Sequence, residues 1–279
     1  MLTAPSVQPG ELAVEVVVDA RGNTRATTLR QRYPQRVTMP LRCDAQYPGA
    51  AVLCIQSPSG GSFSDDTLRT DVHCRPGSHL HLTTQSATQV FAGDGPGARQ
   101  TLTLRVDAGA VLEYYPGTVI PHADSTFVQR VDVEVQPGGV YLGWEALAAG
   151  RIAHGERFAF TRYDAALVVR TDGRAVARDR QVIRPGHSPE RLIGGNYLAT
   201  FVAVAPGRCT ESLLEKIRAI IAGLAGCIAG AGRLPAGAGV FVRLTAAHAP
   251  QLHDMRHQLF SQARTALVAV PSTSAQERR

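Results

Sequence analysis

Hydrophobic and polar residues alternate along much of the first 205 residues, which is the pattern of strands that bury one face. Residues 11–19 are rich in valine and predict the first strand. The turn sequence Arg21-Gly22-Asn23 and the polar residues 25–32 predict a returning strand, so we expect an opening hairpin. The same pattern predicts five later strands, the third and fourth joined by a hairpin turn at Asp172-Gly173: residues 140–148, 157–163, 166–170, 174–183 and 198–204.

A loose repeat with a period near 30 residues runs through this region. Four glycines, each followed three residues later by an apolar residue, lie 28, 32 and 30 residues apart: Gly49, Gly77, Gly109 and Gly139. Alternating segments precede the last three glycines, at residues 70–74, 101–106 and 131–135. Repeated units of strand, tight turn and strand are typical of an irregular β-solenoid, but a plain β-sandwich also has turns at regular intervals. The pattern leaves both arrangements open.

After residue 205 the pattern becomes helical. Thr210 followed by Glu211 predicts a helix start. Apolar residues then recur at helical spacing: Leu213, Ile217, Ile220, Leu224 and Ile228. We expect this helix to end at Gly230 and Gly232. A strand at residues 241–244 and a second helix from Pro250 follow.

These elements predict a mainly β protein with an extended layered β structure, either an irregular β-solenoid or stacked sheets, and two α-helices near the C-terminus. The length of 279 residues is enough to bury a full core in one domain. We therefore expect a single domain over residues 1–279. Within it, residues 10–205 form the layered β region, residues 206–270 a mixed part of helices and strand, and residues 271–279 a polar tail.

The segment from Leu142 to Phe158 contains the only tryptophan of the chain. We interpret it as a strand, a glycine turn at Gly150 and a second strand that starts near Glu156. Trp144 is expected to be a core anchor, because a lone tryptophan on a strand is usually buried. The residue pattern alone makes Glu145 a solvated or hydrogen-bonded neighbour of that anchor.

Composition excludes several classes of protein. The net charge is +6, and the basic residues are scattered among acids without long runs, which argues against a nucleic-acid groove. Five cysteines without a CxxC pair predict reduced thiols rather than a disulfide framework. The polar N-terminal residues do not resemble a signal peptide, and no apolar run reaches the length of a membrane span. We expect a cytoplasmic protein that binds neither nucleic acid nor membrane.

Motifs of catalysis are missing from the sequence. It has no nucleophile elbow, P-loop, dinucleotide-binding fingerprint or HExxH motif, and its dispersed carboxylates do not suit a polysaccharide-cleaving β-solenoid. We therefore expect no enzyme. His79 and His81 lie on one face of a predicted strand and, with His73 on the preceding strand, are candidate ligands of a borderline metal. The alternative interpretation is two half-exposed histidines that flank a buried leucine.

Several stretches together resemble the urease accessory protein D family (UreD, called UreH in some bacteria). They run in order through the chain: Ser57 to Gly61 with Asp66-Thr67-Leu68, Gly77 to Thr84 with Ala87-Thr88, Ala110 to Pro116, and Tyr141 to Phe158. The last stretch is the most specific, since Leu-Gly-Trp-Glu followed by Gly-Arg and Gly-Glu-Arg-Phe is distinctive of the family. The resemblance covers residues 10–205 well and the C-terminal part mainly by type and order of elements.

The resemblance implies a non-enzymatic scaffold. Members of the family bind apo-urease, recruit the accessory proteins F and G, of which G is a GTPase, and help to deliver nickel to the urease active site. An internal water-filled tunnel is thought to carry the metal. Four residues match family positions and are candidates for a nickel path: Asp66, Thr84, Glu145 and Glu156. No permanently bound cofactor is implied, only a transient nickel ion.

This chain departs from the family pattern at two places. Ser64-Asp65-Asp66 stands where a second Gly-Gly usually precedes the aspartate, and Tyr115-Pro116-Gly117-Thr118 stands where Leu-Pro-Gln-Glu is common. One expected carboxylate is therefore absent. The alternative function is a purely structural adaptor without a metal path, whose interface would use an apolar helix face: Leu213, Ile217, Ile220 and Leu224.

Overall fold

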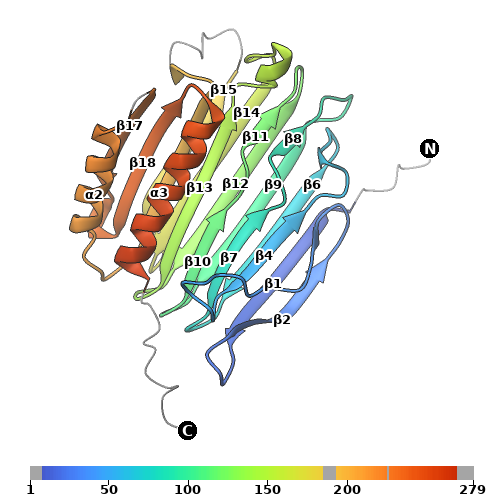
Figure 1. Ribbon diagram of the computed structural model, residues 1–279. Coiled ribbons are helices and arrows are strands. Elements are labelled where there is room, and N and C mark those ends of the chain that lie inside the picture. Colours follow the sequence, from blue (N-terminus) through green and yellow to red (C-terminus); the bar gives the residue numbers. More distant parts are fainter. Residues whose placement is uncertain (1–7, 185–192, 225, 269–279) are drawn as a thin grey trace.

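Two β-sheets stacked face to face make up most of the computed structural model, which describes residues 8–184, 193–224 and 226–268 (Figure 1). The seven-stranded sheet has the order β15-β14-β12-β9-β6-β1-β2. Its strands are β1 (Gly10–Val18), β2 (Thr24–Gln31), β6 (Thr67–Cys74), β9 (Ala98–Val106), β12 (Thr126–Val135), β14 (Arg162–Thr171) and β15 (Arg174–Ile183).

The second sheet has eleven strands, eight of them in the order β17-β18-β16-β13-β10-β7-β4-β3. These eight are β3 (Arg36–Val37), β4 (Ala51–Gln56), β7 (His79–Thr84), β10 (Val111–Tyr115), β13 (Val140–Ala148), β16 (Tyr197–Val204), β17 (Cys227–Arg233) and β18 (Gly239–Ala246). Three short strands branch from this path: β5 (Gly61–Ser62), β8 (Thr88–Val90) and β11 (Val119–Pro121).

The long strands from β4 to β14 alternate between the two sheets, while the short strands β5, β8 and β11 each follow a strand of the eleven-stranded sheet, to which they also belong. Neighbouring strands in this stretch run parallel. Leu80 in β7 lies opposite Leu112 in β10, and Leu112 lies opposite Tyr141 in β13. Equivalent positions are therefore about one repeat apart, so the arrangement is solenoid-like rather than that of a plain sandwich. Antiparallel strands close the stack at both ends, and the expected opening hairpin is confirmed as β1 and β2.

Stacked glycine turns connect the two sheets on one side of the solenoid. Gly77, Gly109 and Gly138 have φ values of 75°, 72° and 83°, a left-handed conformation that glycine adopts without steric cost. The turns touch each other, since the Gly109 amide donates a hydrogen bond of 3.2 Å to the Gly138 carbonyl. The predicted period is thus confirmed, and in its last unit the left-handed residue is Gly138, directly before the repeat glycine Gly139.

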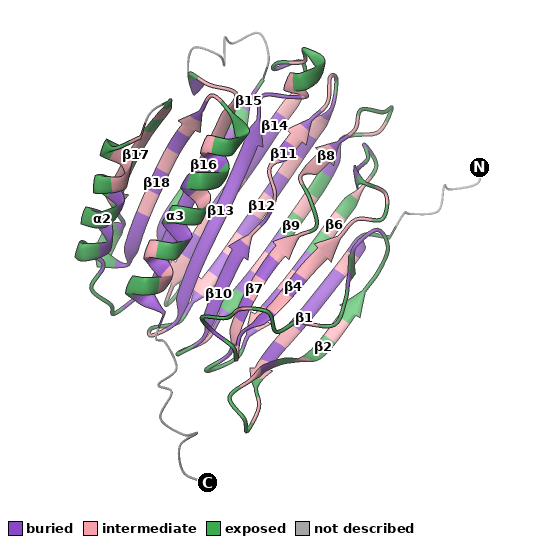
Figure 2. Ribbon diagram, in the orientation of Figure 1, coloured by how far each residue is buried: buried purple, intermediate pink, exposed green. Residues whose placement is uncertain are grey.

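Buried apolar residues fill two main layers of the fold, and Figure 2 marks the buried residues along the strands in purple. The first layer lies between the sheets and contains Leu80 and Leu112. The second lies between the eleven-stranded sheet and the two helices, α2 (Glu211–Ala222) and α3 (Ala249–Leu267), which both cover the same face of that sheet (Figure 1). Trp144 belongs to this second layer and is 1% exposed, so its predicted place in the core is confirmed.

The first helix is shorter than the sequence predicts. It ends at Ala222, and the residues expected to continue it form the edge strand β17, which pairs with β18. The prediction was wrong because Leu224 and Ile228 fit a helical spacing by coincidence, while Gly223 and Gly226 interrupt the helix. Ile228 is 71% exposed on the edge strand. The expected polar tail, residues 271–279, lies outside the described residues.

The strand expected from near Glu156 to residue 163 is absent, because β14 begins only at Arg162. Residues 149–161 instead form an excursion that contains the short 3-10 helix η1 (Ile152–His154). Gly150 and Gly155 have φ values of 139° and 76°, which turn the chain away from the extended path. A second short 3-10 helix, η2 (Pro235–Gly237), precedes β18.

Among the helices in the described part of the chain, α2 and α3 included, none has the length and apolar character that crossing a membrane requires.

Candidate functional site

A buried polar cluster lies between the two sheets around Glu145. Glu145 in β13 is 7% exposed and accepts a hydrogen bond from the side chain of Gln129, which comes from β12 in the facing sheet. Successive residues of a strand point to opposite sides of the sheet. Glu145 therefore points toward the seven-stranded sheet, and Trp144 points toward the helices. A carboxylate is thereby placed in the interior of the solenoid.

The polar cluster continues from Glu145 toward the edge of the fold. Asp179 in β15 accepts hydrogen bonds from Gln181 at 3.1 Å and from Thr200 at 3.2 Å, and it forms an ion pair with Arg243. Gln181 and Arg243 also line a hollow of about 640 Å³ bounded by β15, β17 and β18. Polar side chains therefore extend from Glu145 to the open end of the two sheets.

Burial raises the pKa of Glu145 to about 7, and the nearby negative charge of Asp179 adds to this effect. The hydrogen bond from Gln129 and the charge of Arg243 act in the opposite direction. A carboxyl with this pKa changes its charge near neutral pH. Such a group binds a cation in competition with a proton, which suits weak and reversible coordination.

Asp66 and Thr84 lie elsewhere in the fold. Asp66 immediately precedes β6 and accepts a hydrogen bond of 2.8 Å from the backbone of Phe63, so it caps a turn. Thr84 ends β7, accepts a hydrogen bond of 2.8 Å from the Gly117 amide and donates one of 2.8 Å to the Ser86 carbonyl. Both side chains have structural partners, and neither contacts the cluster around Glu145.

Glu156 lies on the excursion between β13 and β14. It forms an ion pair with Arg151 and accepts a hydrogen bond of 3.1 Å from the Ala123 amide. The bond from Arg151 holds the pKa of Glu156 at about 2. Glu145 and Glu156 share no hydrogen-bonding partner among the described residues, so the structure does not unite the four candidate path residues in one site.

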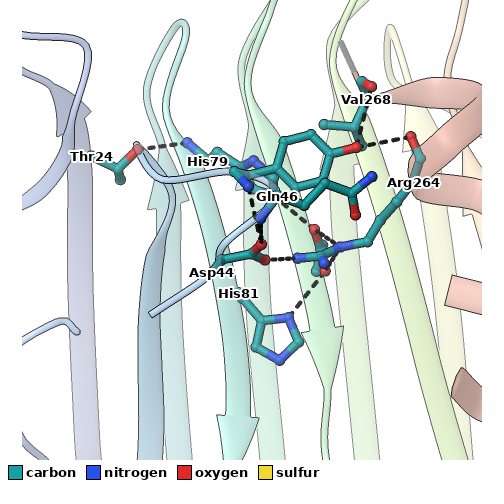
Figure 3. A network of polar contacts seen from close by, with 9 residues as sticks. Thr24, Asp44, Gln46, His79, His81, Arg264 and Val268 are labelled. Atoms are coloured by element: carbon teal, nitrogen blue, oxygen red, sulfur yellow. Dashed lines mark hydrogen bonds and ion pairs between the residues drawn. The ribbon is translucent and has the colours of Figure 1, made fainter. Parts of the chain in front are cut away.

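A second buried carboxylate, Glu113 in β10, contacts Arg264 of α3 on the helix side of the eleven-stranded sheet. Figure 3 shows the surroundings of this contact, with His79, His81, Asp44 and Arg264 labelled. The two oxygens of Glu113 bond to His79 Nε2 at 2.7 Å and to His81 Nδ1 at 3.0 Å. Arg264 of α3 approaches both oxygens, at 2.8 and 3.0 Å, and also forms an ion pair with Asp44. This network ties the C-terminal helix to the solenoid.

Burial opposes the ionisation of Glu113, but the hydrogen bonds from His79 and His81 and the charge of Arg264 outweigh it and hold its pKa far below the usual range. The expectation that both histidines share one strand face is confirmed, because both reach the same carboxylate. Each is only partly exposed, and Leu80 between them is fully buried, as the alternative interpretation predicted.

His73 does not join these histidines. It lies in β6 of the other sheet and bonds to Asp107 at 3.1 Å. Strand β6 precedes β7 in sequence, but the chain changes sheets between them, which sequence spacing did not reveal. Among the residues that the structure describes, no three or more His, Cys, Asp and Glu side chains are grouped so as to hold a metal ion.

Sequence reasoning missed Glu113 and its partner Arg264. The one available signal was a glutamate within the apolar strand sequence Val-Leu-Glu-Tyr-Tyr, next in register to His81. The helix face expected to bind a partner is also placed differently, because Leu213 and Ile217 are fully buried against the protein's own sheet. Ile220 and Leu224 are half-buried in the same layer, so this face is covered in the structure.

Comparison of the sequence with known proteins identifies the family of this chain. The sequence matches the family described as UreD urease accessory protein over residues 8–278. The chain belongs to the UreD family of urease accessory proteins. A urease accessory protein UreD from Mycolicibacterium gilvum (strain PYR-GCK) is 64% identical over 267 residues, which cover 96% of this chain and 98% of that protein. A urease accessory protein UreD 2 from Streptomyces griseus is 33% identical over 230 residues, covering 80% and 78%.

One departure from the UreD pattern has a local structural reason. At Gly117, an added Cβ atom would lie 2.3 Å from the Ser86 carbonyl oxygen, closer than any side chain tolerates. Glycine therefore permits the close approach of the loop after β10 to the loop after β7, which the bond between the Gly117 amide and Thr84 stabilises. The backbone here is organised by that contact rather than by a carboxylate.

Proposed function

We propose that this UreD-family chain is a non-enzymatic scaffold of urease maturation in the cytoplasm. In this role it binds apo-urease, recruits the accessory proteins F and G, and helps to conduct nickel toward the urease active site. Membership in a family of urease accessory proteins supports the scaffold role. Nickel is the cargo in this proposal and is not a resident cofactor.

The single observation that supports a metal path is the polar cluster around Glu145. A divalent cation that moves through a protein needs oxygen and nitrogen ligands that bind it weakly and in succession. Glu145, Gln129, Gln181 and Asp179 supply such oxygens between the two sheets. A buried, unpaired carboxylate costs several kcal/mol, and a passing cation or water offsets this cost.

A purely structural adaptor is the second candidate. The observation that favours it is the mutual hydrogen bonding of the cluster, in which Asp179 is bonded to Gln181, Thr200 and Arg243 and Glu145 is bonded to Gln129. A network whose members satisfy one another also serves as a static core, and in that case the metal would reach urease by another route.

Co-expression with urease and the F and G proteins separates the two candidates. The wild-type chain should co-purify with all three, and the nickel content of urease is then measured for wild type, for Glu145→Ala and for Asp66→Asn. Under the path proposal, Glu145→Ala assembles normally but delivers less nickel. Glu215→Ala, an exposed carboxylate change on α2, is the matched control.

Normal nickel content with Glu145→Ala would favour the adaptor over the path. Failure of the wild-type chain to co-purify with urease and its accessory proteins would remove both candidates.

A further inference from the structure

Two histidines on the exposed side of α3 take no part in the networks described above. His253 and His257 are four residues apart within the 19-residue helix, so they lie on one face with Cβ atoms roughly 6 Å apart. Both side chains are exposed. Neither makes a hydrogen bond or an ion pair with any residue that the structure describes. The ring nitrogens are therefore available to an external ligand.

The helix that carries these histidines is held firmly. Its opposite face buries Leu252, Met255 and Leu259 against the eleven-stranded sheet, each with 5% exposure or less. The spacing of the two histidines is thus fixed by the packed backbone. Only side-chain rotation is lost when both rings bind one ligand, which lowers the entropic cost of chelation.

Open space lies beside each ring. His253 lines a hollow of about 330 Å³ together with Thr83 and Thr84. His257 lines a second hollow of about 250 Å³ together with His81 and Glu113. These hollows provide room for a hydrated ion at the groove between α3 and the ends of β7 and β10.

The basic residues closest to this groove are directed toward the sheet. Arg256 donates a hydrogen bond of 2.9 Å to the Pro116 carbonyl, and its guanidinium lies 4.0 Å from the centre of the Tyr115 ring. Arg264 is held by Glu113 and Asp44. The charge of Arg264 is thus balanced by two carboxylates, while Arg256 keeps its charge but is held against the Tyr115 ring.

We propose that His253 and His257 chelate one divalent cation of the borderline class, such as Ni²⁺, Cu²⁺ or Zn²⁺. Neutral imidazole is a preferred ligand of these ions, and two histidines at positions i and i+4 of a helix form the ligand pair of helical zinc motifs. Because no third ligand is in place among the described residues, water completes the coordination and the ion exchanges readily. This site is separate from the carboxylates of the interior, and metal binding there does not depend on the proposed scaffold role.

His81 lines the same hollow as His257. Its Nδ1 is hydrogen-bonded to Glu113, so Nε2 is the nitrogen that remains for another ligand. A carboxylate bonded to the far nitrogen of a ligating histidine fixes the tautomer and increases its basicity. His81 is therefore suited to approach an ion held by the histidine pair, although it is not in place as a third ligand in the described structure.

The test is equilibrium dialysis of NiCl₂ against the full-length chain without a purification tag, at pH 7.5, where free imidazole is mostly neutral. His253→Ala and His257→Ala should each weaken binding at this site by at least ~10-fold, because loss of a supporting group alone typically costs 10–100-fold. His154→Ala, an exposed histidine change on η1, is the control and should leave the affinity unchanged.

A relocation variant sharpens the test. His257→Gln combined with Gln258→His keeps the number of imidazoles but rotates one by about 100° around the helix, away from His253. The variant should bind nickel as weakly as His257→Ala, while circular dichroism confirms an unchanged fold. Wild-type affinity in the relocation variant, or in His253→Ala, would overturn the proposal.

Discussion

Trp144 and Glu145 are adjacent in β13 but point to opposite sides of the eleven-stranded sheet. Trp144 packs into the apolar layer beneath α2 and α3, while Glu145 bonds to Gln129 of the facing sheet. One dipeptide therefore contributes the largest anchor of the helix layer and the most strongly perturbed carboxylate between the sheets. Changes at these two positions should have different consequences, because they affect different layers.

Glu145 should make the protein less stable as the pH rises. Its folded pKa of about 7 lies above the ordinary glutamate value of 4.5, so the folded state binds the proton more tightly than the unfolded state. The stability gained from the protonated form is fully present below pH 4.5 and is lost as the pH rises through 7. The size of this effect is ~3 kcal/mol at most.

Glu145→Gln mimics the protonated form and should therefore raise the free energy of unfolding at pH 8 by ~1–3 kcal/mol. At pH 5 the variant and the wild type should be nearly equal. Urea unfolding at both pH values measures the difference, with Glu215→Gln as an exposed control. A gain that is the same at both pH values would contradict the assigned cause.

The solenoid was predictable because its signals are local. Gly77 and Gly109 mark turns that need a left-handed residue. The alternating segments between these turns indicate strands from their local sequence alone, and they form strands in the structure. The end of α2 was not predictable from spacing, since Leu224 and Ile228 fit a helix as well as they fit a turn and an edge strand. Pairing of β17 with β18 decided the outcome, and this pairing is tertiary.

The site was only partly predictable for the same reason. Family resemblance pointed to Glu145, and strand periodicity placed His79 and His81 on one face. Arg264 is 151 residues from Glu113 and 220 from Asp44, and no local pattern links residues so far apart. The buried carboxylate network therefore became visible only when α3 was placed on the sheet.

The Glu113 network should be the main attachment of the end of α3. Removal of one partner from a buried charge network costs ~3–5 kcal/mol, so Glu113→Gln should lower the free energy of unfolding by about this amount at pH 7. The folded pKa of Glu113 is depressed, so its contribution is fully present above the ordinary value of 4.5 and is lost gradually as the pH falls from there toward the much lower folded pKa. Urea unfolding at pH 7 and at steps from pH 4.5 to pH 3 should show the gap constant at first and then narrowing progressively on acidification.

Hydrogen exchange locates the effect of Glu113→Gln. Amides in the last turns of α3, near Arg264, should exchange faster than in wild type, while those of β12 should be unchanged. Arg256→Met is the matched control, because Arg256 joins the same helix to the sheet through a neutral carbonyl and an aromatic ring. An equal loss in both variants would show that the buried charge has no special role.

A side chain at Gly109 should strain its turn. Its φ of 72° is a conformation that costs an alanine roughly 1–2 kcal/mol, and the turn is stacked between those of Gly77 and Gly138. Gly109→Ala is expected to lower the thermal midpoint measurably. Gly230→Ala on the edge strand β17 is the control, since nothing lies within 4 Å of an added Cβ atom and its φ is not left-handed. A neutral Gly109→Ala would contradict the stacked-turn account.

Thr84 separates a structural role from a metal-path role. Its hydroxyl accepts a hydrogen bond from the Gly117 amide and donates one to the Ser86 carbonyl, so Thr84→Val leaves both backbone groups without this partner. We expect a loss of ~1–2 kcal/mol in the free energy of unfolding, with Thr84→Ser restoring most of it because serine retains the hydroxyl. If nickel delivery in the co-expression assay follows this stability series, then Thr84 acts by holding the two loops together. A fully stable Thr84→Val variant that nevertheless delivers no nickel would instead assign the hydroxyl to the metal path.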